Sequence, residues 1–207
     1  MSETDPFVVL KDSVAGCRIC RDKPDGPALP HEPRPIVQGT SRARILVASQ
    51  APGNRAHQSG RPFQDPSGMR LRDWLGLDET AFYDPDLVAI VPMGFCFPGY
   101  DRNGGDLPPR RECAPRWQAP FLALLPRIEL LLPIGLHAQI RHLGRGPGLG
   151  ERMRGWRGVF AAESRPRILP LPHPSWRNTA WLRRNSWFET DLLPVLRAEV
   201  ARLRSAA

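Results

Sequence analysis

The chain has 207 residues, a length that fits one domain with a substantial buried core. Its 29 lysines and arginines outnumber its 21 acidic residues, and the resulting net charge of +8 favours a polyanionic partner such as nucleic acid. No apolar run approaches the roughly 18 residues of a membrane-spanning helix, so the sequence excludes a membrane span.

Residues 1–35 form a predicted N-terminal arm of a single domain that spans 1–207. The first residues lack the basic and apolar regions of a secretion signal, so we expect a cytoplasmic protein whose thiols stay reduced. The arm carries Cys17 and Cys20 as a CxxC pair, and the other two cysteines are Cys96 and Cys113. If the fold brings both pairs together, four thiolates suit a [4Fe–4S] cluster or zinc. The second pair is not CxxC, which favours the cluster; the alternative is four unrelated buried thiols.

Short apolar runs alternate with helical patterns along the rest of the chain. Repeated strand–helix units predict an α/β fold with a mainly parallel sheet covered on both faces. The predicted strands are 44–49, 87–93, 128–134 and 167–171, with an edge strand at 159–162, and the predicted helices are 68–77, 114–125, 135–143 and 186–204. Ligands bind such sheets beyond the carboxyl ends of the strands.

Two motifs fall at that edge of the predicted sheet. Gln50–Gly53 follows the first strand, and His173 follows the last one between two prolines that stiffen its backbone. Beyond His173 lie Trp176–Asn178, whose ring and guanidinium groups suit stacking on bases and pairing with phosphates. We therefore expect chemistry next to nucleic acid; the alternative is a proline-rich surface loop with an ordinary histidine.

These residues also resemble a known family, the uracil-DNA glycosylase superfamily, and most closely its iron–sulfur branch, often called family four. The resemblance spans Cys17 to the C-terminal helix. Its motifs are the CxxC and C-x16-C cysteine pairs, Ser49-Gln50-Ala51-Pro52-Gly53, Gly60-Arg61-Pro62-Phe63 with Gly68, and His173-Pro174-Ser175. Each motif alone is weak, but their order and spacing together are specific.

The resemblance implies a three-layer α/β/α fold with a central four-stranded parallel sheet. It also implies a DNA repair enzyme, a monomer without a membrane partner, that hydrolyses the N-glycosidic bond of a flipped-out deoxyuridine and leaves an abasic site. The four cysteines would hold a structural [4Fe–4S] cluster, with zinc as the alternative. The only lysines, Lys11 and Lys23, lie in the arm, so we expect a monofunctional enzyme that forms no Schiff base.

The same resemblance assigns roles to single residues. His173 would donate a hydrogen bond to the charge that develops on uracil O2, and Phe63 would stack on the uracil ring. Backbone groups of Ala51, Pro52 and Gly53 would contact the base or a phosphate. Ser175 would hold a phosphate, while a loop would wedge into the base stack, namely Trp176, Arg177 and Asn178.

One departure from the family pattern concerns the residue that activates water. Gln50 stands where the family has a glutamate, and an amide carries no charge to balance the cationic sugar. Asp65 is the nearest replacement carboxylate, although it also suits a helix N-cap. Asp101 and Asp106, in a glycine-rich insert at 100–109, rank below it. The missing glutamate motivates an alternative function, a DNA damage-binding protein without catalysis.

A second departure concerns base recognition. Pro92 stands where the family has an asparagine, so uracil would be read by backbone groups, by Gln50 or by Asn103. The substrate range therefore extends in principle to hypoxanthine, xanthine or thymine mispairs. Of the other histidines, we interpret His57 as a solvated loop residue, His137 and His142 as structural, and assign no role to His31.

Overall fold

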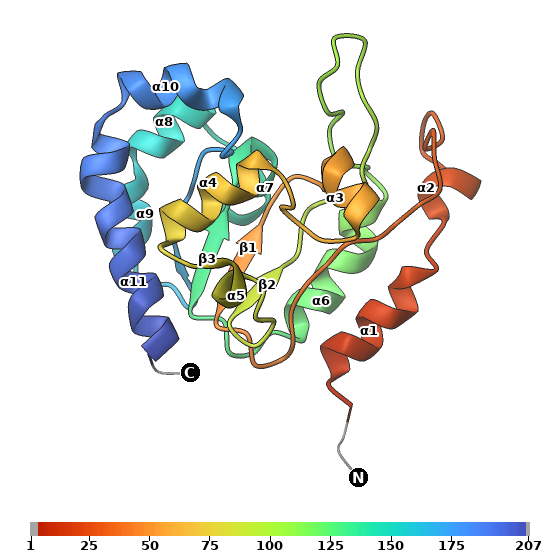
Figure 1. Ribbon diagram of the computed structural model, residues 1–207, viewed down its shortest axis with the longest axis horizontal. Helices are drawn as coiled ribbons and strands as arrows, with labels where there is room; N and C mark the ends of the chain where they lie inside the picture. Colours follow the sequence, from red (N-terminus) through yellow and green to blue (C-terminus); the bar gives the residue numbers. More distant parts are fainter. Residues whose placement is uncertain (1–3, 206–207) are drawn as a thin grey trace.

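The computed structural model describes residues 4–205 and shows a parallel sheet between two layers of helices (Figure 1). The four strands lie in the order β2-β1-β3-β4. They are β1 (Ile45–Ala48), β2 (Val88–Ile90), β3 (Leu130–Pro133) and β4 (Arg167–Ile168). Every pairing in the sheet is parallel, and Ile45 lies opposite both Val88 and Leu130. The expected three-layer fold with four parallel strands is confirmed.

The two faces of the sheet bury alternate residues of each strand. Ile45 and Val47 face one core, whereas Leu46 and Ala48 face the other. The first core is completed by α4 (Pro66–Leu75), α5 (Glu79–Phe82), α8 (Leu149–Arg154), α9 (Trp156–Ala161), α10 (Thr179–Arg184), η3 (Phe188–Leu192) and α11 (Leu193–Ser205). The second is completed by α1 (Pro6–Ala15), η1 (Ala114–Gln118), α6 (Ala119–Ala123) and α7 (Gly135–Leu143). Because both faces are covered, the strands read as unbroken apolar runs.

The N-terminal arm packs against the second core. It comprises α1 and the short α2 (Ile19–Asp22). The Asp5 carboxylate caps α1 by accepting the Phe7 N–H at 2.9 Å, and it also accepts the Ser41 hydroxyl at 2.6 Å. The Phe7 ring lies edge-on to Phe121, with 4.9 Å between the ring centroids. These contacts fix the arm, and the CxxC pair it carries, to the body of the domain.

One predicted strand is wrong. Residues 159–162 were expected to form an edge strand, but 156–161 form helix α9. A short apolar run does not by itself distinguish a strand from a buried helix. Here Trp156 and Phe160, one helical turn apart, both contact the first core, which favours the helix. Within 4–205 no helix is long and apolar enough to cross a membrane; the longest, α11, has 13 residues.

Candidate active site at the carboxyl edge of the sheet

A cavity of about 110 Å³ opens at the carboxyl edge of the sheet. Since one water needs only about 10–15 Å³, the space accommodates a much larger group. It opens into a wider groove that continues along the hairpin 99–107 and the loop 175–178. The cavity wall includes residues that follow β1, β2 and β4 and the loop before α4, among them Ala51, Pro52, Gly53, Phe63, Asp65, Pro92, Asp106, His173 and Ser175. The sequence motifs predicted to meet at this edge do meet there.

The His173 ring is held in one tautomer by its own loop. The backbone N–H of Ser175 donates to His173 Nδ1 at 3.2 Å. A backbone N–H can only donate, so Nδ1 accepts and a neutral ring carries its proton on Nε2. Burial lowers the pKa of His173, and the nearby Asp65 charge opposes this only in part. The Asn178 amide donates to the His173 carbonyl at 2.7 Å and fixes the backbone. His173 is therefore a neutral imidazole with a hydrogen-bond donor at Nε2.

Phe63 occupies an unusual backbone conformation beside the cavity. Its φ of 54° lies in the left-handed region, which a bulky residue adopts only when its surroundings enforce it. Gly68 provides that room in α4: a Cβ added to Gly68 would lie 1.7 Å from the Phe63 carbonyl oxygen. The Phe63 ring packs edge-on against Phe82 at 6.1 Å between centroids. The sequence motif that joins Phe63 to Gly68 thus encodes a close backbone approach.

Asp65 has two tasks. It is the N-cap of α4, where its Oδ1 accepts the Gly68 N–H at 2.8 Å. The alternative reading of Asp65 as a capping residue is therefore confirmed. Its second oxygen, Oδ2, lies at the cavity, 3.9 Å from the position of a Cβ built on Gly53. The side chain can act on a bound group only through this second oxygen.

Gln50 lies at the wider groove rather than in the inner cavity. Its side-chain amide nitrogen donates to the Leu107 carbonyl at 3.3 Å, and its backbone carbonyl accepts the Gly94 N–H at 3.0 Å. Leu107 closes the hairpin 99–107, because its N–H donates to the Gly99 carbonyl at 2.9 Å. Gln50 thus contacts the base of the hairpin.

The hairpin 99–107 corresponds to the predicted glycine-rich insert. It projects as a long green loop near α3 (Asn54–Ser59) in Figure 1. Tyr100 and Asp106 pair across it, and Asp101 accepts the Asn103 and Gly105 N–H groups, each at 2.8 Å. Asp106 brings its carboxylate to the cavity, whereas Asn103 lies outside both the cavity and the groove. Asp101 therefore stabilises the hairpin, and Asp106, which the sequence ranks below Asp65, lines the cavity together with it.

The loop after His173 forms the short helix η2 (Trp176–Asn178). Ser175 caps it by accepting the Arg177 N–H at 3.3 Å, and Arg70 from α4 donates to the Ser175 carbonyl at 3.1 Å. Trp176 is 74% exposed, the highest value among the exposed large apolar side chains of residues 4–205. A fixed loop therefore presents a solvated indole and a guanidinium at the mouth of the cavity. Sequence reasoning missed Arg70, because an arginine on a helix face carries no local signal.

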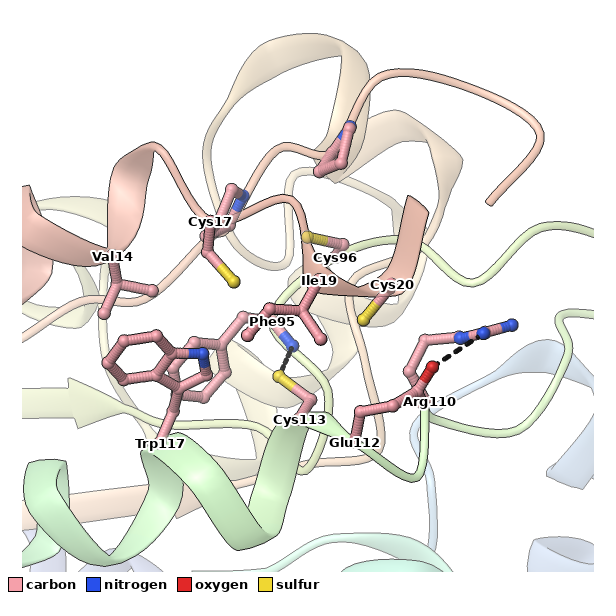
Figure 2. Close-up of a pocket in the computed structure, with 12 residues that line it drawn as sticks. Val14, Cys17, Ile19, Cys20, Phe95, Cys96, Arg110, Glu112, Cys113 and Trp117 are labelled. Carbon is pink, nitrogen blue, oxygen red and sulfur yellow. Dashed lines mark hydrogen bonds and ion pairs between the residues drawn. The ribbon is translucent and has the colours of Figure 1, made fainter. Parts of the chain in front are cut away.

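All four cysteines line a second, small cavity of about 20 Å³ (Figure 2). Cys17 follows α1, Cys20 lies on α2, Cys96 follows β2, and Cys113 directly precedes η1. Their sulfurs surround a common space in Figure 2. The Phe95 N–H donates to Cys113 Sγ at 3.3 Å. The fold thus brings the two predicted pairs together.

The arrangement of the thiols bears on what they could hold. Burial raises the pKa of Cys96 and of Cys113 to about 12, so a metal must displace their protons on binding. In residues 4–205 no three His, Cys, Asp or Glu side chains are gathered closely enough to hold a single metal ion. The thiolates of one zinc lie only about 3.8 Å apart, given Zn–S bonds of ~2.3 Å. A cluster binds thiolates at separate corners, and four cysteines that line one cavity are compatible with that donor set.

The remaining histidines lie outside the cavity. His57 was interpreted as a solvated loop residue, but it is on α3, partly buried, with its ring centroid 4.2 Å from that of His31. Burial and the charges of His31 and Arg34 lower the pKa of His57. His137 is exposed on α7. His142, also on α7, is partly buried, and this burial lowers its pKa to about 4.

A protein-family model described as the uracil DNA glycosylase superfamily matches residues 36–197. The match starts at Ile36, which lines the cavity, and ends within α11, so it includes all four strands. It covers more than three quarters of the 207 residues. The part of the arm that carries Cys17 and Cys20 lies outside it.

Proposed function

This chain belongs to the uracil DNA glycosylase superfamily, which supports a DNA glycosylase function. We propose that it removes uracil from DNA as a monofunctional enzyme and as a monomer. The observation that carries the proposal is the neutral His173, whose Nε2 donor lines a cavity between the ends of parallel strands. The product is an abasic site, the substrate of base excision repair.

The cavity receives the target base after it has left the DNA stack. A base inside a duplex is out of reach, so the nucleotide must be extruded into a pocket. Phe63 lines the pocket on a backbone that Gly68 holds in place, and it offers a ring for stacking on the base. The backbone of Ala51–Gly53 forms an adjoining wall that can hydrogen-bond the base edge.

His173 stabilises the leaving group. As the glycosidic bond breaks, negative charge develops on the uracil oxygen, and a neutral donor at Nε2 strengthens its hydrogen bond to that oxygen. A preorganised donor aimed at developing charge contributes roughly 3–4 kcal/mol by analogy with oxyanion-hole deletions. A protonated ring is not required, which agrees with the lowered pKa of His173.

The DNA backbone and the vacated stack are held by the loop 175–178. Exposed Trp176 suits insertion between bases, and Arg177 and Ser175 suit phosphate contacts. Neither Lys11 nor Lys23 lines the cavity or the groove, so within residues 4–205 no lysine amine is available there to attack the sugar. This supports hydrolysis without a Schiff base.

The four cysteines would hold a [4Fe–4S] cluster with a structural role. Bound there, the cluster would tie the arm to the loop after β2 and supply no step of the hydrolysis. Supporting this, all four thiols line one cavity. An iron and sulfide assay with a visible absorption spectrum of the purified protein distinguishes a cluster from zinc.

The test of function is base release from a labelled oligonucleotide that contains one deoxyuridine, followed by alkaline cleavage of any abasic site. Cleavage at deoxyuridine, absent when thymidine replaces it, is the expected result. No cleavage of any modified base in single-stranded or double-stranded DNA would leave a damage-binding protein without catalysis.

One observation favours a wider lesion range as a second candidate. Pro92 lines the cavity, and no asparagine or glutamine is among the described residues that line it. Base discrimination then rests on backbone groups, serines and carboxylates. Parallel assays with hypoxanthine and xanthine measure this range directly.

A further inference from the structure

We propose that Asp106 is the catalytic carboxylate that activates the attacking water, and that Gln50 is a positioning residue that holds the hairpin carrying Asp106. The proposal rests on the glycosylase function proposed above and identifies, within that site, the acid missing from position 50.

Gly53 lies between two carboxylates. A Cβ built on it would be 3.6 Å from Asp106 Oδ2 and 3.9 Å from Asp65 Oδ2, so these oxygens are at most the total of those distances, 7.5 Å, apart. Both residues line the cavity together with His173. The space above Gly53 is thus suited to a water held by carboxylates.

Asp106 is the freer of the two carboxylates. Asp65 already uses Oδ1 to cap α4. Within the described residues, no hydrogen bond contributes to the pKa shift of the Asp106 carboxylate. Although Asp106 as a whole residue is exposed, desolvation at the cavity and the charges of Asp65 and Asp101 raise its pKa, while Arg177 opposes this. A carboxylate of raised pKa and free lone pairs is the better proton acceptor.

Gln50 connects the first motif to the residue that directly follows Asp106. Its amide N–H donates to the Leu107 carbonyl, and Leu107 directly follows Asp106. A glutamate at position 50 has no N–H to donate, and its charge would repel that carbonyl. The amide that departs from the family pattern therefore suits a hairpin whose carboxylate does the work.

The step balances as a simple hydrolysis. The water oxygen forms a bond to the sugar C1′ while the bond from C1′ to the base nitrogen breaks, and the bonding electron pair leaves with the base. Asp106 accepts a proton from the water, and His173 Nε2–H stabilises the departing anion. Solvent later protonates the base and removes the proton from Asp106. No redox partner is involved.

The first test compares wild type, Asp106→Asn and Asp12→Asn in single-turnover base release from deoxyuridine DNA. Asp12 is an exposed residue of α1 and serves as the matched control. Loss of a general base costs about 100-fold to 10,000-fold, so Asp106→Asn should fall at least 100-fold in rate. DNA affinity and the urea midpoint should change little, and Asp12→Asn should match wild type.

The outcomes separate the two proposals. If wild type releases no base from any substrate, the proposed function fails and this inference fails with it. If wild type is active and Asp106→Asn keeps its rate within threefold, only the role of Asp106 is overturned. The same holds if Asp65→Asn, which retains a capping side chain, loses more activity than Asp106→Asn.

The second test uses Gln50→Glu, for which the two proposed roles of position 50 predict opposite changes in the rate of base release. If this position supplies the acid, the substitution raises the rate. If Gln50 positions Asp106, the substitution lowers the single-turnover rate at least tenfold without changing DNA affinity or the urea midpoint. A rate increase overturns the positioning role.

A third variant addresses the water directly. Gly53 has φ −80°, which alanine adopts freely, and the added methyl would make ordinary contacts with both carboxylates. Gly53→Ala should therefore fold normally yet lose at least tenfold in rate, because the methyl occupies the space assigned to the water. An unchanged rate contradicts that assignment.

Discussion

The close approach of Gly68 to Phe63 can be tested by Gly68→Ala. In an unobstructed helix this change stabilises a protein by up to about 1 kcal/mol. Here the new Cβ would lie 1.7 Å from the Phe63 carbonyl oxygen and 2.7 Å from its carbon. The obstacle is backbone, so no side-chain rotation relieves the clash, and Phe63 already has a φ of 54°.

The magnitude follows from three contributions. Overpacking costs up to about 3 kcal/mol, and displacement of the Asp65 cap adds about 1 kcal/mol. The gain in helix propensity offsets about 1 kcal/mol. Gly68→Ala should therefore lower the free energy of unfolding by about 3 kcal/mol. It should also reduce base release, because Phe63 and Asp65 both border the cavity.

The assay is urea unfolding followed by the fluorescence of the six tryptophans. Gly158→Ala is the matched control, since Gly158 lies within α9 with nothing within 4 Å of its added Cβ. The control should be stabilised by up to about 1 kcal/mol. If Gly68→Ala is as stable as wild type, the close approach is absent and the explanation for the Phe63 backbone is refuted.

Three further predictions concern other parts of the molecule. His173→Ala should lower the single-turnover rate by about 100-fold or more, for a loss of ~3–4 kcal/mol, with little change in DNA affinity; equal losses in both would remove its leaving-group role. DNA binding should weaken steeply with salt, and Arg177→Gln should reduce the slope of log K against log salt by about 1; a flat salt response would argue against phosphate contacts. Burial lowers the pKa of His142 to about 4, so the unfolded chain takes up a proton that the folded chain refuses. Between pH 6.5 and 4, the free energy of unfolding of wild type should thus fall by up to about 3 kcal/mol relative to His142→Gln. Urea unfolding of both proteins across this pH range measures the difference, and coincident curves would contradict the prediction.

The sheet could be predicted because its local and global signals agree. The strands β1, β2 and β3 are buried on both faces, which requires continuous apolar runs that are visible without a structure. The helix 135–143 matched α7 at both ends, since Gly135 leaves β3 with φ +76° and Gly144 ends the helix with φ +82°. Residues 159–162 misled because an apolar run carries no periodicity of its own.

The site could be predicted only where residues follow strand ends. The Gln50–Gly53 and His173–Ser175 motifs belong to that class. Ala51–Gly53, His173 and Ser175 line one cavity, and Gln50 lies at the wider groove. Asp106 does not belong to that class, because a hairpin returns it to Gly53 from far along the chain. The direction of the Gln50 side chain toward Leu107 is likewise a property of tertiary packing. Asp65 and Asp106 both line the cavity, so proximity to the first motif along the chain was an incomplete guide to which carboxylates reach it.

The brevity of β4 has a consequence for when the protein is active. This strand pairs with β3 through only two residues. Beyond it, the Leu169 N–H donates to Leu131 and the Leu171 N–H to Pro133, while the Leu171 carbonyl accepts the Gly135 N–H and the Gln139 amide. Such an edge opens more readily than the centre of a sheet. We expect an opening of this edge to carry the imidazole away from the cavity while β1, β2 and the first-motif wall stay assembled. Amide exchange at Leu169 and Leu171 would thus report the time during which an otherwise folded molecule lacks its chemistry.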